Sequence, residues 1–211
     1  MFISLEGIEG SGKSSHVHTI QAFLEAHGLK SAATREPGGT AIAEQIRKLL
    51  LRDSEEELTP EAEALLFYAA RAQHIAHFIK PQLERGVSVI CDRFVDSGYA
   101  YQQGGRAVPL ARLDQLTDWI VQDCLPDLTF VFDLPAEQAL ARINDRPLDR
   151  IEQEHLSFHQ QVRQAYLDRA RQQPERYAII NAAQTKKSVK ADIVFCLEAY
   201  FETDGFLPVK R

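Results

Sequence analysis

Short apolar runs alternate along the chain with longer stretches in which apolar residues recur at helical spacing. The short runs predict five strands, at Phe2–Leu5, Ser31–Thr34, Val87–Cys91, Leu128–Leu134 and Tyr177–Asn181. Several of these runs are apolar on both faces, which is typical of strands that are covered by helices on both sides of a parallel sheet.

The longer stretches predict helices with recognisable ends. Thr59 and Pro60 are typical of a helix start, and Gly28 and Gly86 follow predicted helix ends. The predicted helices are Lys13–His27, Thr40–Leu51, Pro60–Glu84, Pro109–Asp123, Pro135–Ile143, Ile151–Gln172 and Thr185–Phe201. Strands that alternate with helices predict an α/β fold, a doubly wound parallel five-stranded sheet, and no linker divides residues 1–211 into more than one domain.

The first predicted strand runs into the motif G-x-x-x-x-G-K-[ST], which opens the following helix. Glycines let backbone N–H groups face phosphate oxygens, and the helix N-terminus adds a positive dipole end. Lys13 is expected at the β- and γ-phosphates of a nucleotide, and the Ser14 hydroxyl is expected on Mg²⁺. The predicted ATP-binding residues of this P-loop are Gly7, Ile8, Glu9, Gly10, Ser11, Gly12, Lys13, Ser14 and Ser15.

Composition narrows the class of protein. The chain has 24 Lys and Arg against 30 Asp and Glu, a net charge of -6, which disfavours a nucleic-acid-binding protein. The longest apolar runs are too short to span a membrane, and no secretory signal is visible. Three separated cysteines without ligand spacing indicate reduced thiols, so a cytoplasmic protein without membrane or nucleic-acid partners is expected.

A P-loop alone leaves several functions open. The N-K-x-D motif of a GTPase is absent, and a motor ATPase would need further domains, so a small-molecule kinase is favoured. The histidines His16, His18, His74 and His77 show no metal or nucleophile pattern, and most are expected at the surface. A nucleotide-binding switch without phosphoryl transfer stays open as an alternative.

Four further blocks, "TREPGGT", "LFYAARAQH", "CDRFVDSGYAYQQGGR" and "LDRIEQE", accompany the P-loop. Together they resemble the bacterial thymidylate kinase family, from Phe2 to about Phe201. The resemblance implies a P-loop nucleoside monophosphate kinase that converts ATP and dTMP to ADP and dTDP with Mg²⁺, in dTTP biosynthesis, as a homodimer. A kinase for another pyrimidine nucleotide or for a nucleoside remains an alternative.

The strand "VSVIC" delivers Asp92 and Arg93 to its carboxyl end, where open α/β sheets bind ligands. Asp92 is expected to hold Mg²⁺ directly or through water, and Arg93 to bind the acceptor phosphate. Asp133 ends another apolar strand and is a rival to Asp92, but the Leu-Pro that follows it suggests a helix start.

Phe67 and Arg71 stand four residues apart, on one face of a predicted helix, where a ring and a guanidinium can stack on a pyrimidine and bond its edge. In the family these positions bind thymine. Ser97 and Gln102 are polar groups able to read the thymine edge, and Tyr101 resembles the aromatic residue that crowds the sugar C2′. Gly98 replaces the Ser, Thr or Asn often found in the family, which predicts weaker exclusion of dUMP.

Two arginines, Arg35 and Arg47, are expected to complete the acceptor-phosphate site, with Glu36 aiding Mg²⁺ binding or loop order. Glu9 resembles the acidic residue that faces the acceptor 3′-OH in the family. The segment at about 142–153 corresponds to the family's mobile lid. Because the P-loop holds no arginine, the cation at the transferred phosphoryl is expected from the lid, from Arg146 first and Arg142 next, with Arg150 on ATP.

Overall fold

The computed structural model describes residues 1–143, 145 and 147–203. Its centre is a parallel sheet of five strands in the order β2-β3-β1-β4-β5. The strands are β1 (Phe2–Glu6), β2 (Ser31–Arg35), β3 (Ser88–Asp92), β4 (Leu128–Asp133) and β5 (Tyr177–Asn181). All five predicted strands are confirmed, and the α/β fold class with them.

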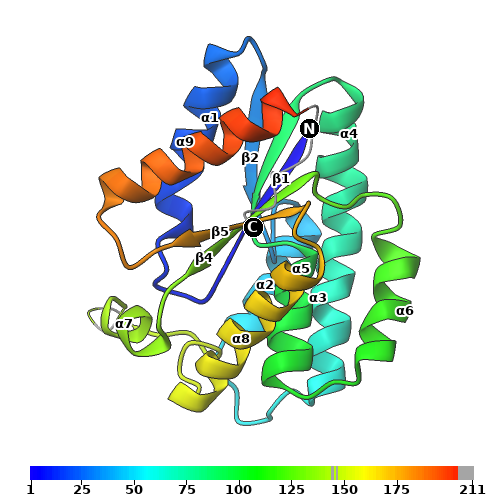
Figure 1. Ribbon diagram of the computed structural model, residues 1–211. Coiled ribbons are helices and arrows are strands. Elements are labelled where there is room, and N and C mark those ends of the chain that lie inside the picture. The colour runs from blue at the N-terminus through cyan, green and yellow to red at the C-terminus, as the bar shows by residue number, and fades with distance from the viewer. Residues whose placement is uncertain (144, 146, 204–211) are drawn as a thin grey trace.

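Helices connect these strands and cover both faces of the sheet (Figure 1). α1 (Val17–Ala26) and α9 (Lys186–Glu202) lie together on one face, and α1 is preceded by a short 3-10 turn, η1 (Lys13–His16). The other face carries α3 (Pro60–His74), α4 (Lys80–Glu84), α5 (Val95–Gly98), α6 (Leu110–Ile120) and α8 (Leu156–Gln172). Two further helices, α2 (Ala41–Leu51) and α7 (Ala136–Ala141), follow the carboxyl ends of β2 and β4.

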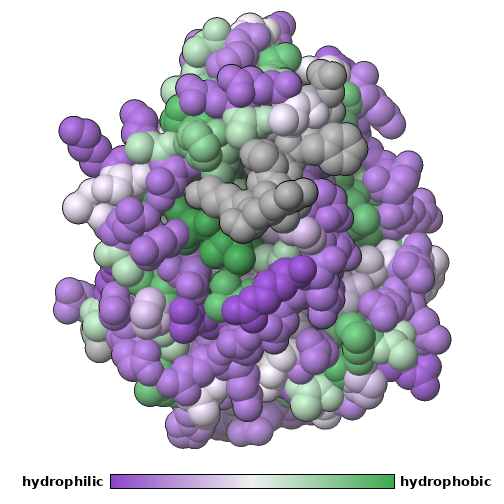
Figure 2. Space-filling model, in the orientation of Figure 1, coloured by the Kyte–Doolittle hydropathy of each residue, from purple (hydrophilic) through white to green (hydrophobic). Residues whose placement is uncertain are grey.

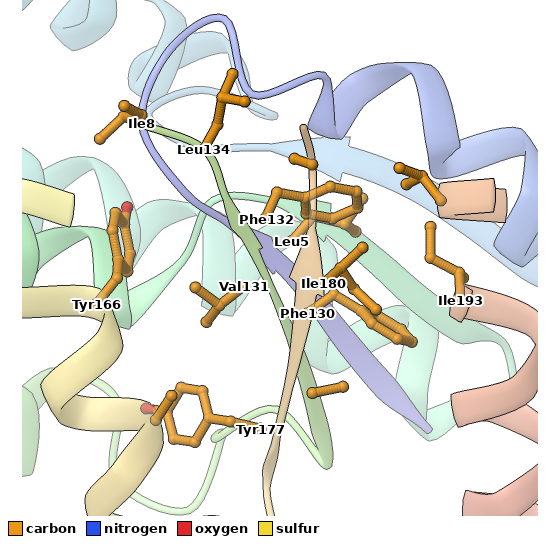
Figure 3. Packing of buried hydrophobic residues seen from close by; sticks show 14 of the residues in the cluster. Leu5, Ile8, Phe130, Val131, Phe132, Leu134, Tyr166, Tyr177, Ile180 and Ile193 are labelled. Carbon is orange, nitrogen blue, oxygen red and sulfur yellow. The ribbon is translucent and has the colours of Figure 1, made fainter. Parts of the chain in front are cut away.

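Side chains alternate across the sheet and form a core on each face. In β4, Phe130 and Phe132 point toward α9, where Ile193 meets them, whereas Val131 points to the other face (Figure 3). Tyr166 of α8 packs on that second face, and all five of these side chains are almost completely buried. Burial of such apolar side chains contributes roughly 1.5–3 kcal/mol each, which fixes the helices against the sheet.

Two helical segments contain a wider π turn. The predicted helix Pro60–Glu84 is interrupted by η2 (Ile75–Ile79). The segment after Asp92, for which no helix was predicted, is α5 followed by the π helix η3 (Tyr99–Gly105). A Cβ atom on Gly104 would lie 2.7 Å from the Ala165 Cβ of α8, so glycine is needed there because two helices approach closely.

The surface agrees with the composition. Polar side chains cover most of the face seen in Figure 2, with smaller apolar areas between them. Among the described helices, none has the length and apolarity that a bilayer crossing requires. The carboxyl ends of the parallel strands meet at one edge of the sheet, since Asp92 lies in register with Leu5 and with Arg35. The site is built at this edge.

Candidate functional site

The loop between β1 and η1 requires its glycines, because of backbone conformation at all three and also because of close packing at Gly7 and Gly10. Gly7, Gly10 and Gly12 have φ angles of 139°, 77° and 88°, in the region that disfavours other residues. A Cβ atom on Gly10 would lie 2.2 Å from the Ala139 carbonyl oxygen of α7. The backbone of this P-loop is therefore held in place by its neighbours before any ligand binds.

Lys13 is enclosed by the same loop. Its side chain is buried, and Nζ donates hydrogen bonds to the carbonyl oxygens of Gly7 at 3.0 Å and Ile8 at 2.9 Å. Burial first, and then the nearby Arg93 guanidinium, lower the pKa of Lys13 to about 8, while the charge of Glu9 opposes this shift. A buried cation is costly in free energy, and a nearby anion stabilises its charged form. A nucleotide phosphate would supply that anion.

Ser14 joins the P-loop to the end of β3, because its hydroxyl donates a hydrogen bond to the Asp92 carboxylate. The rival carboxylate, Asp133, is held instead by Arg163 of α8, through Nε at 2.6 Å and Nη2 at 3.0 Å. Asp92 is therefore the strand-end carboxylate that lies beside the P-loop. Within the described residues no group of three or more His, Cys, Asp or Glu could hold a metal ion.

A pocket extends from the P-loop to the loop between β5 and α9. Arg142 bridges its two walls, with Nη1 donating to the Gly10 carbonyl at 3.3 Å and Nη2 to the Ala182 carbonyl at 3.2 Å. The pocket is lined by Glu9, Gly10, Ser11, Gly12, Lys13, Ser14, Ser15, His16, Arg142, Ile143, Ala182, Gln184, Lys186 and Val189. We call it the P-loop pocket.

A second cavity lies on the other side of Glu9, and we call it the acceptor cavity. It is lined by Glu9, Glu36, Pro37, Arg47, Leu51, Phe67, Arg71, Arg93, Ser97, Tyr101, Gln102, Asp149, Ile151, Glu152 and His159. Nine of the predicted acceptor-site residues meet in it, although they come from five separate parts of the chain. Glu9 lines both spaces, which places the two pockets side by side.

Arg71 is the most deeply buried arginine that lines the acceptor cavity. It is 1% exposed, Nε donates to Glu36 at 2.8 Å, and Nη2 donates to the Phe94 carbonyl at 2.9 Å. Its third nitrogen, Nη1, is buried and has no partner within the described part of the chain. A Cβ atom on Gly98 would lie 3.4 Å from Nη1, so a hydroxyl-bearing side chain at this position could have bonded to it.

Glu36 is fixed from two directions. Besides the Arg71 bond, its second oxygen is 3.0 Å from His74 Nδ1, and His74 Nε2 is 2.7 Å from the Thr34 hydroxyl. The prediction that most histidines lie at the surface is wrong for His74 and for His16, which are buried. Glu36 follows β2 and precedes a cis peptide bond to Pro37, so this network orders the loop after the strand.

Arg93 occupies the centre of the site in a left-handed conformation, with φ at 71°. Nη2 donates to Glu9 at 3.0 Å and to the Tyr101 hydroxyl at 3.1 Å. Nη1 donates to the hydroxyl oxygens of Ser97 at 3.3 Å and Tyr166 at 3.2 Å. Ser97 lines the cavity, and its hydroxyl is hydrogen-bonded to Arg93 and Glu6; its predicted contact with the thymine edge stays a prediction.

Behind Arg93 lies Glu6, a buried carboxylate that the sequence reading missed. Glu6 accepts hydrogen bonds from the Phe94 N–H at 2.7 Å, the Ser97 hydroxyl at 2.7 Å and the Tyr166 hydroxyl at 3.0 Å. Because both hydroxyls donate to Glu6, their lone pairs remain for Arg93. Burial first, and then the charge of Asp96, raise the pKa of Glu6 to about 7, while the hydrogen bond from Ser97 opposes this shift.

The remaining predicted arginines lie in different places. Arg47 lines the acceptor cavity and donates to the Pro37 carbonyl at 2.9 Å, and burial followed by the charge of Arg35 lowers its pKa. Arg35 is half exposed and pairs with Glu44 at 3.0 Å, outside the residues that line the cavity. Arg150 donates to the buried Glu63 at 2.5 Å, away from the P-loop pocket, and Arg146 lies outside the described residues.

Six residues of the acceptor cavity were not singled out from the sequence: Pro37, Leu51, Asp149, Ile151, Glu152 and His159. Asp149, Ile151 and Glu152 belong to the block "LDRIEQE", so the motif itself was a signal for them. His159 belongs to an amphipathic helical pattern, and nothing in that pattern distinguishes a histidine of a binding site from any other helix residue.

Comparison with known proteins agrees with this geometry. The family model described as thymidylate kinase matches residues 5–193. A thymidylate kinase of Pseudomonas putida is 50% identical over 203 residues, covering 96% of this chain and 97% of its own length. One of Chromobacterium violaceum is 50% identical over 202 residues, covering 95% of each. The crystal structure of thymidylate kinase from Ehrlichia chaffeensis matches with a TM-score of 0.75 and 33% identity, over 93% of this chain and 98% of that chain.

Proposed function

The chain belongs to the thymidylate kinase family, and from this membership we infer that it transfers a phosphoryl group from ATP to dTMP, giving dTDP for nucleotide biosynthesis. The proposal assigns the two neighbouring pockets to the two substrates. The triphosphate of ATP binds in the P-loop pocket, and dTMP binds in the acceptor cavity. Glu9 lies at the boundary between them.

One observation carries the assignment of the acceptor base: the buried Nη1 of Arg71, which lacks a partner among the described residues. A donor without an acceptor is costly when buried, and the 4-carbonyl oxygen of thymine would satisfy it. Cytosine would present an amino group to the same donor. Phe67 and Gln102 line the same cavity, as a stacking surface and as a second polar contact.

Catalysis in this arrangement is positioning and charge stabilisation. The acceptor phosphate oxygen attacks the γ-phosphoryl group in line, and it needs no general base because it is already ionised. Arg93, held by Glu9, Tyr101, Ser97 and Tyr166, is placed to bind the acceptor phosphate together with Arg47. Lys13 and Arg142 are placed at the P-loop to offset the charge that develops during transfer.

Ser14 and Asp92 fit a Mg²⁺ site of the kind used with nucleotides. Mg²⁺ in such sites is held by one or two protein oxygens together with substrate phosphates and water, so a protein cluster of three ligands is not needed. The Ser14 hydroxyl and the Asp92 carboxylate lie in hydrogen-bond contact. When bound, Mg²⁺ would neutralise phosphate charge; the protein's part is to hold these two oxygens beside Lys13.

Several further assignments belong to the proposal. The segment that begins at Arg142 acts as the lid, because Arg142 lines the P-loop pocket while Asp149 and Glu152 line the acceptor cavity. All of residues 1–211 form one kinase domain. The enzyme is cytoplasmic, consistent with the buried thiols Cys91 and Cys124.

We also propose a homodimer that uses α2 and α3, which pack against each other. The large apolar side chains Ile42 and Leu49 of α2 and Leu65 of α3 are exposed. Light scattering after size exclusion tests this, since Leu65→Glu should convert a dimer to a monomer.

A coupled ADP-release assay with dTMP, dUMP, dCMP, UMP, AMP and thymidine tests the activity. The expected order places dTMP first and dUMP about 10- to 200-fold lower in kcat/KM, because dUMP lacks one methyl group. Arg71→Ala should reduce the preference for dTMP over dCMP, since the discriminating donor is removed. ATP binding without any acceptor-dependent ADP release would identify a nucleotide-binding switch instead.

A further inference from the structure

Glu6, the last residue of the central strand β1, is fully buried and lies outside the lining of both pockets. Its Oε1 accepts from the Phe94 N–H at 2.7 Å, and its Oε2 accepts from the hydroxyls of Ser97 at 2.7 Å and Tyr166 at 3.0 Å. Arg93 Nη1 donates to these same two hydroxyl oxygens. The carboxylate is therefore connected to the guanidinium by two routes, each through a single hydroxyl.

The carboxylate fixes the direction of the hydrogen bonds along both routes. An ionised carboxylate only accepts and a guanidinium only donates, so the hydroxyl protons are directed toward Glu6 and the lone pairs toward Arg93. The hydroxyl oxygens of Ser97 and Tyr166 are also 2.7 Å apart, which gives one of the protons an indirect route to the same carboxylate. In either arrangement both hydroxyl oxygens accept from Nη1.

The other end of the guanidinium faces the acceptor cavity. Nη2 donates to Glu9 and to the Tyr101 hydroxyl, and both of these residues line that cavity. Because a guanidinium is planar, two acceptors at Nη1 set the plane in which Nη2 meets a ligand. We propose that Glu6 is a positioning residue for the acceptor phosphate, which sets the orientation in which Arg93 binds it. This inference rests on the proposed function of the acceptor cavity.

The substitution Glu6→Gln separates this role from simple support of the backbone. The Phe94 N–H requires an oxygen as its partner, so the amide NH₂ of the glutamine faces the two hydroxyls. The hydroxyl protons then lose their common acceptor. One of them can be donated to the other hydroxyl, and the second is left beside Arg93, which has only N–H donors. The volume and the bond to Phe94 are kept, whereas Arg93 loses an acceptor.

Calorimetry with dTMP and with thymidine, which lacks the phosphate, measures the effect. The assay is run at about pH 8, above the pKa of about 7 to which burial first and then Asp96 raise Glu6. The Kd of thymidine divided by the Kd of dTMP gives the contribution of the phosphate to binding. Glu6→Gln should lower this ratio by about 10-fold, the scale of one hydrogen bond to a charged group, and leave the Kd of thymidine within about threefold.

Tyr166→Phe and Tyr177→Phe form a matched pair, because each removes a buried tyrosine hydroxyl that donates to a buried carboxylate. Tyr166 donates to Glu6 and accepts from Arg93, whereas Tyr177 donates to Asp96 at 2.6 Å. Tyr166→Phe should lower the ratio by about 3- to 10-fold, since one hydroxyl route remains, and Tyr177→Phe should leave it within about twofold.

Equal losses of affinity for dTMP and thymidine in Glu6→Gln and Tyr166→Phe would mean that Glu6 only stabilises the fold, and would overturn the proposal. An unchanged ratio in Tyr166→Phe would contradict it as well, even if Glu6→Gln did not fold. So would an active wild type that binds thymidine as tightly as dTMP. Absence of dTMP-dependent ADP release from the wild type would instead reject the proposed function itself.

Discussion

At the scale of single residues, the buried carboxylates Glu36, in the acceptor cavity, and Glu63, outside its lining, each have two basic side-chain partners. Arg71 and His74 share Glu36, and Arg106 and Arg150 share the buried Glu63. Removing one member of such a group leaves an unpaired buried charge, which is more costly than losing a surface ion pair. The polar atoms that remain for a ligand are few and fixed in direction, which is the basis for selectivity.

Replacement of Lys13 by alanine should lower kcat by at least about 10²-fold, because one preorganised charge at the transferred phosphoryl group is lost. Steady-state ADP release measures this, and circular dichroism checks the fold. A correctly folded Lys13→Ala enzyme with near-wild-type kcat would contradict the role given to Lys13.

Glu6→Gln should change how stability depends on pH. The pKa of Glu6 rises from 4.5 to about 7 on folding, mainly because of burial and then because of Asp96. The folded state therefore holds this proton more tightly, and the resulting stabilisation is lost as pH rises from about 4.5 to about 7. Relative to the wild type, the free energy of unfolding of Glu6→Gln should rise over that interval.

Urea denaturation at about pH 5, 6 and 7.5 measures the difference between the Glu6→Gln variant and the wild type. Glu61→Gln, at an exposed carboxylate in the first turn of α3, is the control and should show little trend. If the difference between Glu6→Gln and the wild type stayed constant with pH, Glu6 would not hold a proton with raised affinity.

At the scale of elements, the sequence predicted those that carry a local pattern. All five strands and the P-loop follow from apolar runs and glycine spacing, and Asp92 was preferred to Asp133 from its flanking residues. The contacts of Glu6 with Tyr166 could not be predicted, because 160 residues separate the two and neither belongs to a motif. The helices at 95–105 were not predicted, and Gly104 lies where η3 and α8 approach closely, a contact that no local pattern indicates.

Gly104→Ala tests the importance of that approach. The added Cβ would lie 2.7 Å from the Ala165 Cβ, so η3 and α8 must separate, at a cost of about 1–3 kcal/mol in the free energy of unfolding. η3 carries Tyr101 and α8 carries His159, and both line the acceptor cavity. KM for dTMP should therefore rise while ATP binding changes little.

Ala165→Gly provides a rescue for Gly104→Ala. In the double variant the crowded Cβ pair is gone, so the KM for dTMP should return toward the wild-type value, although glycine in α8 costs about 1 kcal/mol of helix stability. Additive losses in the double-mutant cycle would show that the two positions are not in contact.

At the scale of the whole molecule, the two pockets depend on different parts of one sheet edge. The P-loop pocket uses the end of β1 and the loop after β5, whereas the acceptor cavity uses the segments after β2 and β3 together with α3 and α8. Among the described residues, Glu9 is the one that lines both pockets. Damage to one pocket should therefore leave binding in the other largely intact.

Thermal denaturation with each ligand alone tests this separation. A ligand at about 100 times its Kd stabilises the folded state by about 2.7 kcal/mol, which for a chain of this size raises Tm by roughly 5–10 °C. Lys13→Ala should lose most of the shift with a nonhydrolysable ATP analogue and keep the shift with dTMP, whereas Arg71→Ala should show the reverse. Both ligands act on the same folding equilibrium, so a variant that lost both shifts would mean that the pockets form one cooperative unit. If each variant loses the Tm shift of one ligand only, the two sites bind their ligands independently, although they fold together. Each ligand then stabilises the protein through the cations of its own pocket.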